Sequence, residues 1–269
     1  MTSPLLDLEH VTKRFGRVVI AEDLSLAVGT GDMVGIVGPN GAGKTSLFGL
    51  ISGDLAPGGG QVRFAGRTVT KLDSAARCKL GIGRTYQVPR PFGDMTVFEN
   101  LLVAAQQGGG LRRRASYAAA VSALERTGMS GQANSPAERL GLLQRKRLEL
   151  ARALATQPTL LLLDEVAGGL TDPEVAQLVE IVRGVNADGI AVIWIEHVVR
   201  ALTATVGRLI CLSGGKFVGD GEPSAVLAQP AVREVFLGSE VSAALAGGSL
   251  EATPTGTGDG AASGERSEP

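Results

Sequence analysis

The positions of apolar residues divide the chain into two kinds of predicted strand. Residues 5–11 and 18–28 alternate apolar and polar side chains in short stretches, which predicts an antiparallel β-region near the N-terminal end. Residues 33–37, 160–163 and 190–195 are short apolar runs, a pattern typical of strands buried on both faces of a parallel sheet. Together these strands favour the α/β class, with a separate antiparallel part.

A helical pattern fills residues 96–156. Thr96 and Glu99 have the spacing of a capping box, which predicts a helix start. Helical stretches are predicted at 101–105, at 115–127 and at about 144–156. This part of the chain is therefore expected to be an inserted helical subdomain.

After the helical part, strands and helices alternate again. Asp172, Pro173 and Glu174 predict a helix start with proline at its first position. Residues 208–212 and 217–219 predict a hairpin. Strands that alternate with helices indicate a mainly parallel sheet covered on both faces.

Three parts of the chain follow from these patterns. Residues 1–95 and 157–238 are expected to form an α/β core that includes the antiparallel β-region, and residues 96–156 the helical subdomain. Residues 239–269 contain few large apolar side chains, so we expect a disordered tail.

Composition and charge place the chain among ordinary globular proteins. Of its 269 residues, 44% are hydrophobic and 20% are charged, and the net charge of −1 gives no electrostatic reason to expect a nucleic-acid partner. No stretch has the pattern of a signal peptide or a membrane span. Cys78 and Cys211 fit a reducing compartment, and residues 112–114, all arginine, are interpreted as a solvated face.

Residues 38–45 match the phosphate-binding pattern G-x-x-x-x-G-K-[S/T] between a predicted strand and a predicted helix. The glycines let backbone N–H groups surround phosphate oxygens, and the helix start adds a favourable dipole. Lys44 is expected to reach the β- and γ-phosphates of a nucleoside triphosphate, and the Thr45 hydroxyl to hold Mg²⁺. The residues predicted to bind the nucleotide here are Gly38, Pro39, Asn40, Gly41, Ala42, Gly43, Lys44, Thr45 and Ser46.

A pair of acidic residues follows the apolar run 160–163. Asp164 is expected to hold Mg²⁺ opposite Thr45. Glu165, one residue further on, is expected to orient or deprotonate the attacking water. The sequence thus predicts hydrolysis of the bound nucleotide.

These motifs resemble those of the ATP-binding subunits of ABC transporters, from Leu5 to Leu237. The resemblance implies a P-loop NTPase (RecA-like) core sheet, ATP and Mg²⁺ as ligands, and hydrolysis coupled to transport. It implies that Phe15 stacks on adenine, that Gln87 contacts Mg²⁺ and senses the membrane subunit, and that His197 contacts the γ-phosphate. It also implies a second ATP-binding subunit, polytopic permease subunits, and a place at the cytoplasmic face of the membrane.

Within that family, several stretches are similar to the ATPases of branched-chain amino-acid importers. They are residues 83–87, 91–92, 95–100, 167–170 and 232–238. Importers of amides such as urea share these stretches, as do some lipid exporters. The resemblance favours import of branched-chain amino acids or similar small amides and leaves a lipid exporter open.

One motif departs from the family pattern. The signature Leu-Ser-Gly-Gly-Gln is expected to begin 24 residues before Asp164, where the chain has Leu140, Gly141, Leu142, Leu143 and Gln144. In the family this loop caps the γ-phosphate of the ATP on the opposite subunit. The chain lacks the serine hydroxyl, and both leucines are expected to crowd the phosphate. Each lost hydrogen bond to a charged phosphate costs about 1.5–3 kcal/mol.

The degenerate signature leads to two hypotheses. In the first, the subunit pairs with a non-identical ATPase and hydrolyses ATP only weakly alone. In the second, the chain is an ATP-binding regulatory protein with little hydrolysis, which the intact Lys44, Asp164, Glu165 and His197 argue against.

Overall fold

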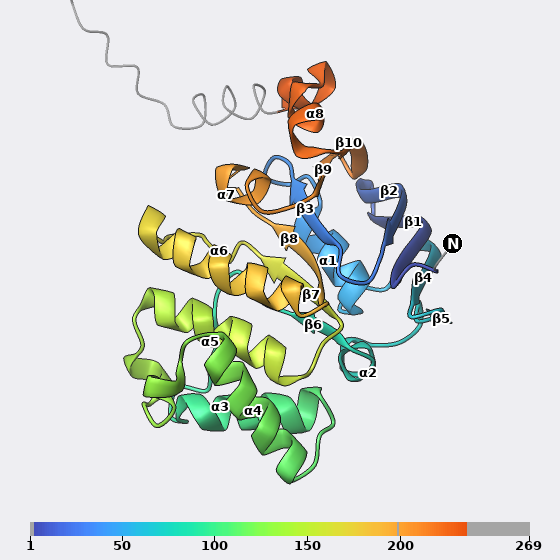
Figure 1. Ribbon diagram of the computed structural model, residues 1–269. Helices are drawn as coiled ribbons and strands as arrows, with labels where there is room; N and C mark the ends of the chain where they lie inside the picture. Colours follow the sequence, from blue (N-terminus) through green and yellow to red (C-terminus); the bar gives the residue numbers. More distant parts are fainter. Residues whose placement is uncertain (1–2, 198, 236–269) are drawn as a thin grey trace, which may run out of the picture.

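The computed structural model describes residues 3–197 and 199–235, and two β-sheets form its scaffold (Figure 1). The N-terminal sheet consists of β1 (Leu6–Phe15), β2 (Val18–Val28), β4 (Gly59–Phe64) and β5 (Arg67–Thr68). The central sheet consists of β3 (Met33–Val37), β6 (Ile82–Arg84), β7 (Leu160–Asp164), β8 (Ala191–Ile195), β9 (Arg208–Ser213) and β10 (Lys216–Gly221). The N-terminal sheet has the order β2-β1-β4-β5 and is antiparallel. The central sheet has the order β10-β9-β3-β8-β7-β6 and is parallel except for the β9–β10 hairpin.

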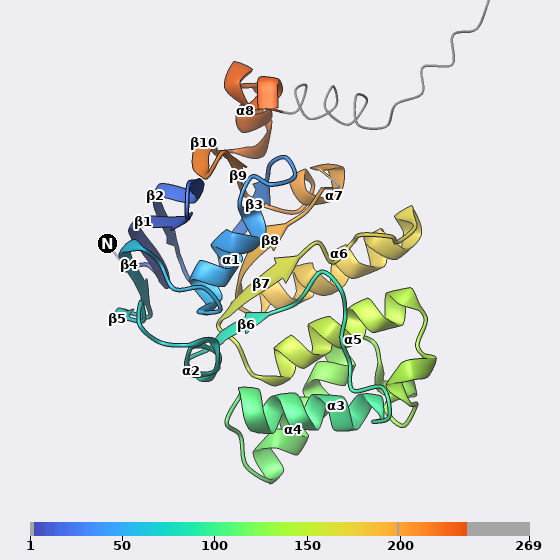
Figure 2. The ribbon, with the colours of Figure 1, turned by 180° about the vertical axis from the view of Figure 1, so that it is seen from behind.

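Helices cover both faces of the central sheet (Figures 1 and 2). The α-helices are α1 (Lys44–Ser52), α2 (Ser74–Lys79), α3 (Val97–Val103), α4 (Arg114–Arg126), α5 (Leu142–Ala155), α6 (Asp172–Ala187), α7 (Val199–Thr203) and α8 (Pro223–Ala228). A π-helical turn, Ala104–Gly108, extends α3, and Ser130–Gln132 and Ala137–Arg139 are short 3₁₀ helices.

The central sheet separates two hydrophobic cores because its inner strands β3, β7 and β8 are mainly apolar. In β7, Leu160 and Leu162 pack with α1 and the N-terminal sheet, whereas Leu161 and Leu163 pack with α5 and α6. Successive side chains of a strand point to opposite faces, so burial on both faces requires a continuous apolar run. The predicted α/β fold, with a mainly parallel core sheet and an N-terminal antiparallel β-region, is confirmed.

The helices between β6 and β7 gather at the lower end of the molecule in Figure 1. Helix α3 begins with the predicted capping box: the N–H of Glu99 donates to Thr96 Oγ1 (3.2 Å), and the N–H of Thr96 donates to Glu99 Oε2 (2.8 Å). Helices α4 and α5 pack against α3 and against each other. The limits of a helical subdomain at 96–156 stay a prediction.

Some elements differ from the sequence-based expectation. Pro173 is the second residue of α6, not the first, and Thr171 with Glu174 forms a capping box that the sequence analysis overlooked. Helix α2 and strand β6 were not predicted. Strand β6 has only three residues, which is too short to show a period.

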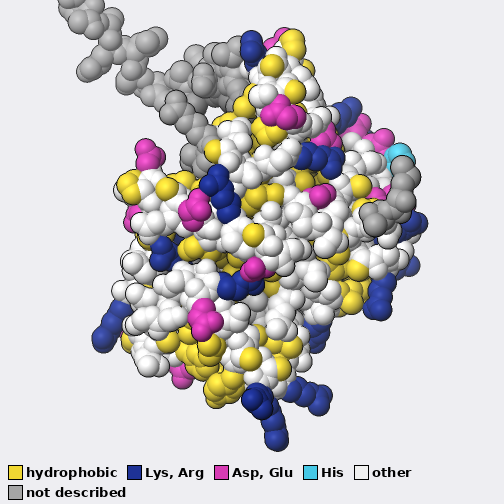
Figure 3. Space-filling view, in the orientation of Figure 1, with side chains coloured by type: hydrophobic (Ala, Val, Ile, Leu, Met, Phe, Trp, Pro, Cys, Tyr) yellow, Lys and Arg dark blue, Asp and Glu magenta, His cyan; other side chains and the backbone are white. Residues whose placement is uncertain are grey.

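The predicted tail, 239–269, and the stretch 236–238 lie outside the described residues. Within the described part of the chain, no helix has the length and apolar character needed to span a membrane. On the face shown in Figure 3, basic and acidic side chains are interspersed, in keeping with the nearly equal totals of 26 and 27.

Candidate nucleotide site

Two glycines shape the loop between β3 and α1. Gly38 has φ +153°, and a Cβ atom there would lie 2.0 Å from the carbonyl oxygen of Leu212 in β9. Gly43, the N-cap of α1, has φ +102°, and its Cβ would lie 2.5 Å from the carbonyl oxygen of Ile20 in β2. A left-handed φ and a close backbone approach both require glycine. These residues let the loop pass between β2 and β9.

Lys44 is buried at the start of α1. Its Nζ donates to the carbonyl oxygens of Gly38 (2.8 Å) and Pro39 (3.1 Å). Burial lowers the pKa of Lys44, whereas the charges of Glu165 and Asp164 act in the opposite direction. The ammonium group is therefore held by carbonyl oxygens of the loop and is attracted by the negative charges of Asp164 and Glu165 at the end of β7.

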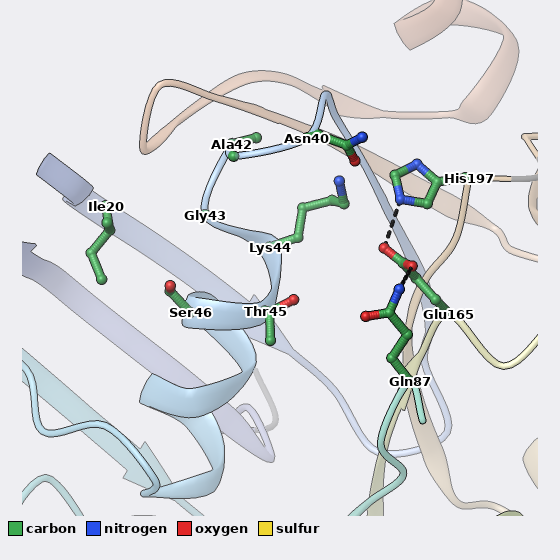
Figure 4. Close-up of a pocket in the computed structure, with 11 residues that line it drawn as sticks. Ile20, Asn40, Ala42, Gly43, Lys44, Thr45, Ser46, Gln87, Glu165 and His197 are labelled. Atoms are coloured by element: carbon green, nitrogen blue, oxygen red, sulfur yellow. Dashed lines mark hydrogen bonds and ion pairs between the residues drawn. The ribbon is translucent and has the colours of Figure 1, made fainter. Parts of the chain in front are cut away.

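A pocket of about 550 Å³ opens beside this loop. In Figure 4, side chains enter it from the loop and α1, from the segment after β6, and from the segments that follow β7 and β8. The lining residues are Ile20, Asn40, Gly41, Ala42, Gly43, Lys44, Thr45, Ser46, Gln87, Glu165 and His197. The sequence analysis had singled out each of these except Ile20, so the fold brings together residues that are far apart in the chain.

The carboxylate of Glu165 is held from two sides (Figure 4). Gln87 Nε2 donates to Glu165 Oε2 at 2.5 Å, and His197 Nε2 lies 2.6 Å from Glu165 Oε1. The backbone of Glu165 is left-handed, with φ +48°, which is uncommon for a residue other than glycine. Glu165 is therefore fixed by a strained backbone and by two side-chain contacts at the edge of the pocket.

Asp164 is buried at the end of β7, and its two oxygens differ in their contacts. Oδ2 accepts a hydrogen bond from Arg84 Nη2 at 3.2 Å, whereas Oδ1 has no hydrogen-bond partner in the described part of the chain. Burial raises the pKa of Asp164, and the positive charge of Arg84 opposes that shift. Asp164, Thr45 and Gln87 line a second pocket of about 430 Å³. Carboxylate, hydroxyl and amide oxygens are ligands that suit Mg²⁺, so these residues fit that ion.

Three charged residues near the site were missed by sequence reasoning. Arg84 pairs with Asp164, Lys146 Nζ donates to the backbone of Gln87 and Glu165, and Glu196 Oε1 accepts the N–H of Ala167 at 2.6 Å. Glu196 directly follows the apolar run of β8, a signal that could have drawn attention to it. No local pattern marks Lys146, which lies within a helix.

Phe15 is not one of the residues that line the pocket of the phosphate loop. It ends β1, is 55% exposed, and has Lys13 Nζ 5.1 Å from its ring centroid. Its role in stacking on adenine stays a prediction.

The signature stretch, Leu140 to Gln144, opens α5 and does not line the pocket of the phosphate loop. Gly141 is the N-cap, with φ −68° and no side-chain cap. Leu142 is 47% exposed, but Leu143 is buried. Only Leu142 therefore has an exposed side chain, because successive residues of a helix point about 100° apart. The expectation that both leucines crowd a phosphate stays a prediction.

Comparisons with known proteins point to one family. The ABC transporter family matches residues 21–168. The chain is 34% identical to the high-affinity branched-chain amino acid transport ATP-binding protein LivG of Salmonella typhimurium (strain LT2), over 88% of this chain and 99% of LivG. It is 32% identical to the lipopolysaccharide export system ATP-binding protein LptB of Acidithiobacillus ferridurans, over 88% of this chain and 98% of LptB.

A similar solved structure is the ADP conformation of an ATP-binding cassette of an ABC transporter. It superposes with a TM-score of 0.81 at 29% identity, and the match covers 88% of this chain and all of that one. Because the family match spans more than half of the chain and the relatives match nearly end to end, this protein belongs to the ABC transporter family, as an ATP-binding subunit of the ABC ATPase type.

Proposed function

We propose that this protein is the ATP-hydrolysing subunit that powers an ABC importer of branched-chain amino acids or similar small amides. The observation that carries the catalytic part is the position of Glu165, whose carboxylate lies between Gln87 and His197 in the pocket of the phosphate loop. A carboxylate held in this way is a suitable general base for water.

The proposed reaction is hydrolysis of the γ-phosphate of ATP. Backbone amides of the loop and the ammonium of Lys44 hold the phosphates, and His197 contacts the γ-phosphate. Glu165 accepts a proton as a water oxygen bonds to the γ-phosphorus, and the bond from that phosphorus to the bridging oxygen of ADP breaks. Thr45, Asp164 and Gln87 would hold Mg²⁺, which neutralises phosphate charge when bound.

The transported substrate is inferred from the relatives. LivG is named as a branched-chain amino acid transport protein, and this chain matches it over nearly the full length of both. The ATPase itself does not touch the transported molecule, so the substrate depends on the membrane partner. The match to LptB supports a lipid exporter as the second candidate.

The proposed membrane partners are polytopic permease subunits, which would place the protein at the cytoplasmic face of the membrane. The second pocket, which Gln87 also lines, is the proposed contact region. The segment that follows β6 exposes three large hydrophobic side chains, those of Tyr86, Val88 and Phe92. Such side chains are frequent at protein interfaces.

The signature stretch supports a non-identical second ATPase. Gly141 offers no hydroxyl, and the exposed Leu142 places an apolar side chain at the start of α5. In a pair with an ATPase whose signature is unaltered, the ATP bound by this chain's Lys44 and Glu165 would be capped by that unaltered signature. The ATP bound by the partner would be capped by the Leu140–Gln144 stretch and would be hydrolysed slowly.

The test is ATP hydrolysis by the purified protein, alone and mixed with candidate partner ATPase and permease subunits. We expect low activity alone and higher activity in the productive mixture. Glu165→Gln should lower that activity by about 100-fold or more while ATP binding persists, because only the base is removed. Glu180→Gln, which changes an exposed glutamate of α6, is the matched control and should have no effect.

The other outcomes decide between the candidates. Negligible hydrolysis in every mixture, together with tight ATP binding, would favour the regulatory protein. Cooperative hydrolysis by the isolated chain at a high rate would contradict the non-identical pairing. Stimulation only by lipid-exporter permease subunits would favour the second transport candidate.

A further inference from the structure

A buried lysine links three segments beside the candidate catalytic residue. Lys146 belongs to α5, two residues after the signature stretch, and is 4% exposed. Its Nζ donates to the carbonyl oxygen of Gln87 at 2.8 Å and to that of Glu165 at 3.2 Å. One ammonium group therefore joins the start of α5 to the backbone of both residues.

The surroundings of Lys146 explain why a buried charge is tolerated there. Burial lowers the pKa of Lys146, whereas the negative charges of Glu196, Glu165, Glu149 and Asp164 act in the opposite direction and favour the ammonium group. A buried charge requires partners of opposite charge and hydrogen-bond acceptors, and Lys146 has both. The lysine is consequently fixed in place rather than free to reach solvent.

The carbonyl bound by Lys146 belongs to the strained residue of the site. Glu165 has φ +48°, in the left-handed region. Its N–H donates to the carbonyl of Ile195 at 2.9 Å, and its carbonyl also accepts the N–H of Gly168 at 3.3 Å. A strained backbone conformation persists only when neighbouring groups hold it in place. Lys146, on α5, is a side chain that does this, through its hydrogen bond to the carbonyl oxygen of Glu165.

We propose that Lys146 is a positioning residue that holds the backbone of Glu165 against that of Gln87, and so sets the carboxylate of Glu165 for hydrolysis. This inference rests on the proposed function. It assigns Lys146 no contact with ATP, since its side chain does not line the pocket of the phosphate loop. Loss of Lys146 should therefore affect turnover and not nucleotide affinity.

The experiment compares Lys146→Met, Lys146→Gln and Lys146→Arg with the wild-type protein in the active mixture. In Lys146→Met we expect kcat to fall by about 100-fold, the cost of a base displaced by about 1 Å, with an unchanged Kd for ATP. Lys146→Gln keeps a polar group too short to reach both carbonyls and should be nearly as impaired. Lys146→Arg keeps a cation with several donors and should recover part of the rate.

Hydrogen exchange gives a readout that does not depend on hydrolysis. Lys146→Met should speed amide exchange in residues 84–90 and 164–168. The matched control is Arg145→Met, the neighbouring cation on α5, which donates to the exposed carbonyl of Glu138 and should leave both rate and exchange unchanged.

The outcomes separate this inference from the proposed function. Wild-type kcat or wild-type exchange in Lys146→Met would overturn the role of Lys146, and so would loss of ATP binding in all three variants. A wild-type protein that hydrolyses no ATP in any mixture would contradict the proposed function alone, because the exchange comparison still reports on Lys146.

Discussion

Gly38 and Gly43 fit the phosphate loop into a space where no side chain can enter. At Gly38, the carbonyl oxygen of Leu212 occupies the place of a Cβ atom, and at Gly43 the carbonyl oxygen of Ile20 does so. Gly41 also has a positive φ, +78°, but a Cβ there would meet no atom within 4 Å. Gly38 and Gly43 are thus required because a side chain would collide with backbone atoms, whereas Gly41 is favoured only by its positive φ.

Gly38→Ala and Gly41→Ala separate these two requirements. Gly38→Ala should lower the free energy of unfolding by more than about 2 kcal/mol, because the methyl group collides with backbone. Gly41→Ala should lower it by about 1 kcal/mol, the cost of a left-handed alanine alone. Urea unfolding measures both, and equal losses would show that the contact with Leu212 is unimportant.

At the scale of secondary-structure elements, Arg84 ties α1, β6 and β7 together. Its Nη1 donates to Ser52 Oγ (3.2 Å), in the last residue of α1, and to Asp54 Oδ2 (2.9 Å), two residues further on. Its Nη2 donates to Asp164 Oδ2 (3.2 Å). The guanidinium group also lies 5.0 Å from the ring centroid of Tyr86. The side chains of Arg84 and Asp164 are only 9% and 3% exposed, so this ion pair is shielded from water.

Arg84→Met should therefore be strongly destabilising. Removal of the guanidinium leaves the buried carboxylate of Asp164 without its cation, and we expect a loss of about 3–5 kcal/mol in the free energy of unfolding. Arg63→Met breaks the exposed pair with Glu9, whose side chains are 43% and 40% exposed, and should cost no more than about 1 kcal/mol. Similar losses in the two variants, measured by denaturant unfolding, would show that Arg84 is not a structural tie.

At the scale of the whole molecule, the phosphate-loop pocket and the signature stretch are separate. Glu165 lines the pocket, whereas Gly141 and Leu142 are exposed at the start of α5 and do not line it. In the proposed pairing, a γ-phosphate in this pocket would be capped by the signature of the other subunit. The activity of each site would then depend on which two chains pair.

Gly141→Ser combined with Leu142→Gly tests the weakness of the signature. If altered signatures limit a pair of identical chains, the variant should hydrolyse ATP at least about tenfold faster than wild type when purified alone, since each restored phosphate contact is worth about 1.5–3 kcal/mol. Leu143 is left unchanged because it is buried. Gly141→Ala with Leu142→Gly supplies the Cβ atom without the hydroxyl and should gain less than the serine variant, because it removes only the crowding by Leu142. An unchanged rate in the serine variant would show that the signature is not limiting.

The sequence by itself determined the features that contiguous residues encode. The continuous apolar run of β7 predicts burial on both faces, and the Thr96–Glu99 spacing predicts a helix start; the structure has both. The phosphate loop likewise follows from a strand, glycines and a helix in order. In each case the pattern suffices because backbone geometry repeats over a few residues. Gln87 and His197 were singled out only through the resemblance to a family.

Only the tertiary structure decided which of these segments meet. Arg84 and Asp164 are 80 positions apart, and Lys146 is 59 positions from Gln87, so the order and register of the central sheet bring them together. The tertiary structure also decided that Leu142 is exposed while Leu143 is buried. This difference depends on where α5 begins and on which side of α5 packs against the core. The spacing of apolar residues within one segment does not specify which distant segments it contacts, because those contacts form only when many segments pack together.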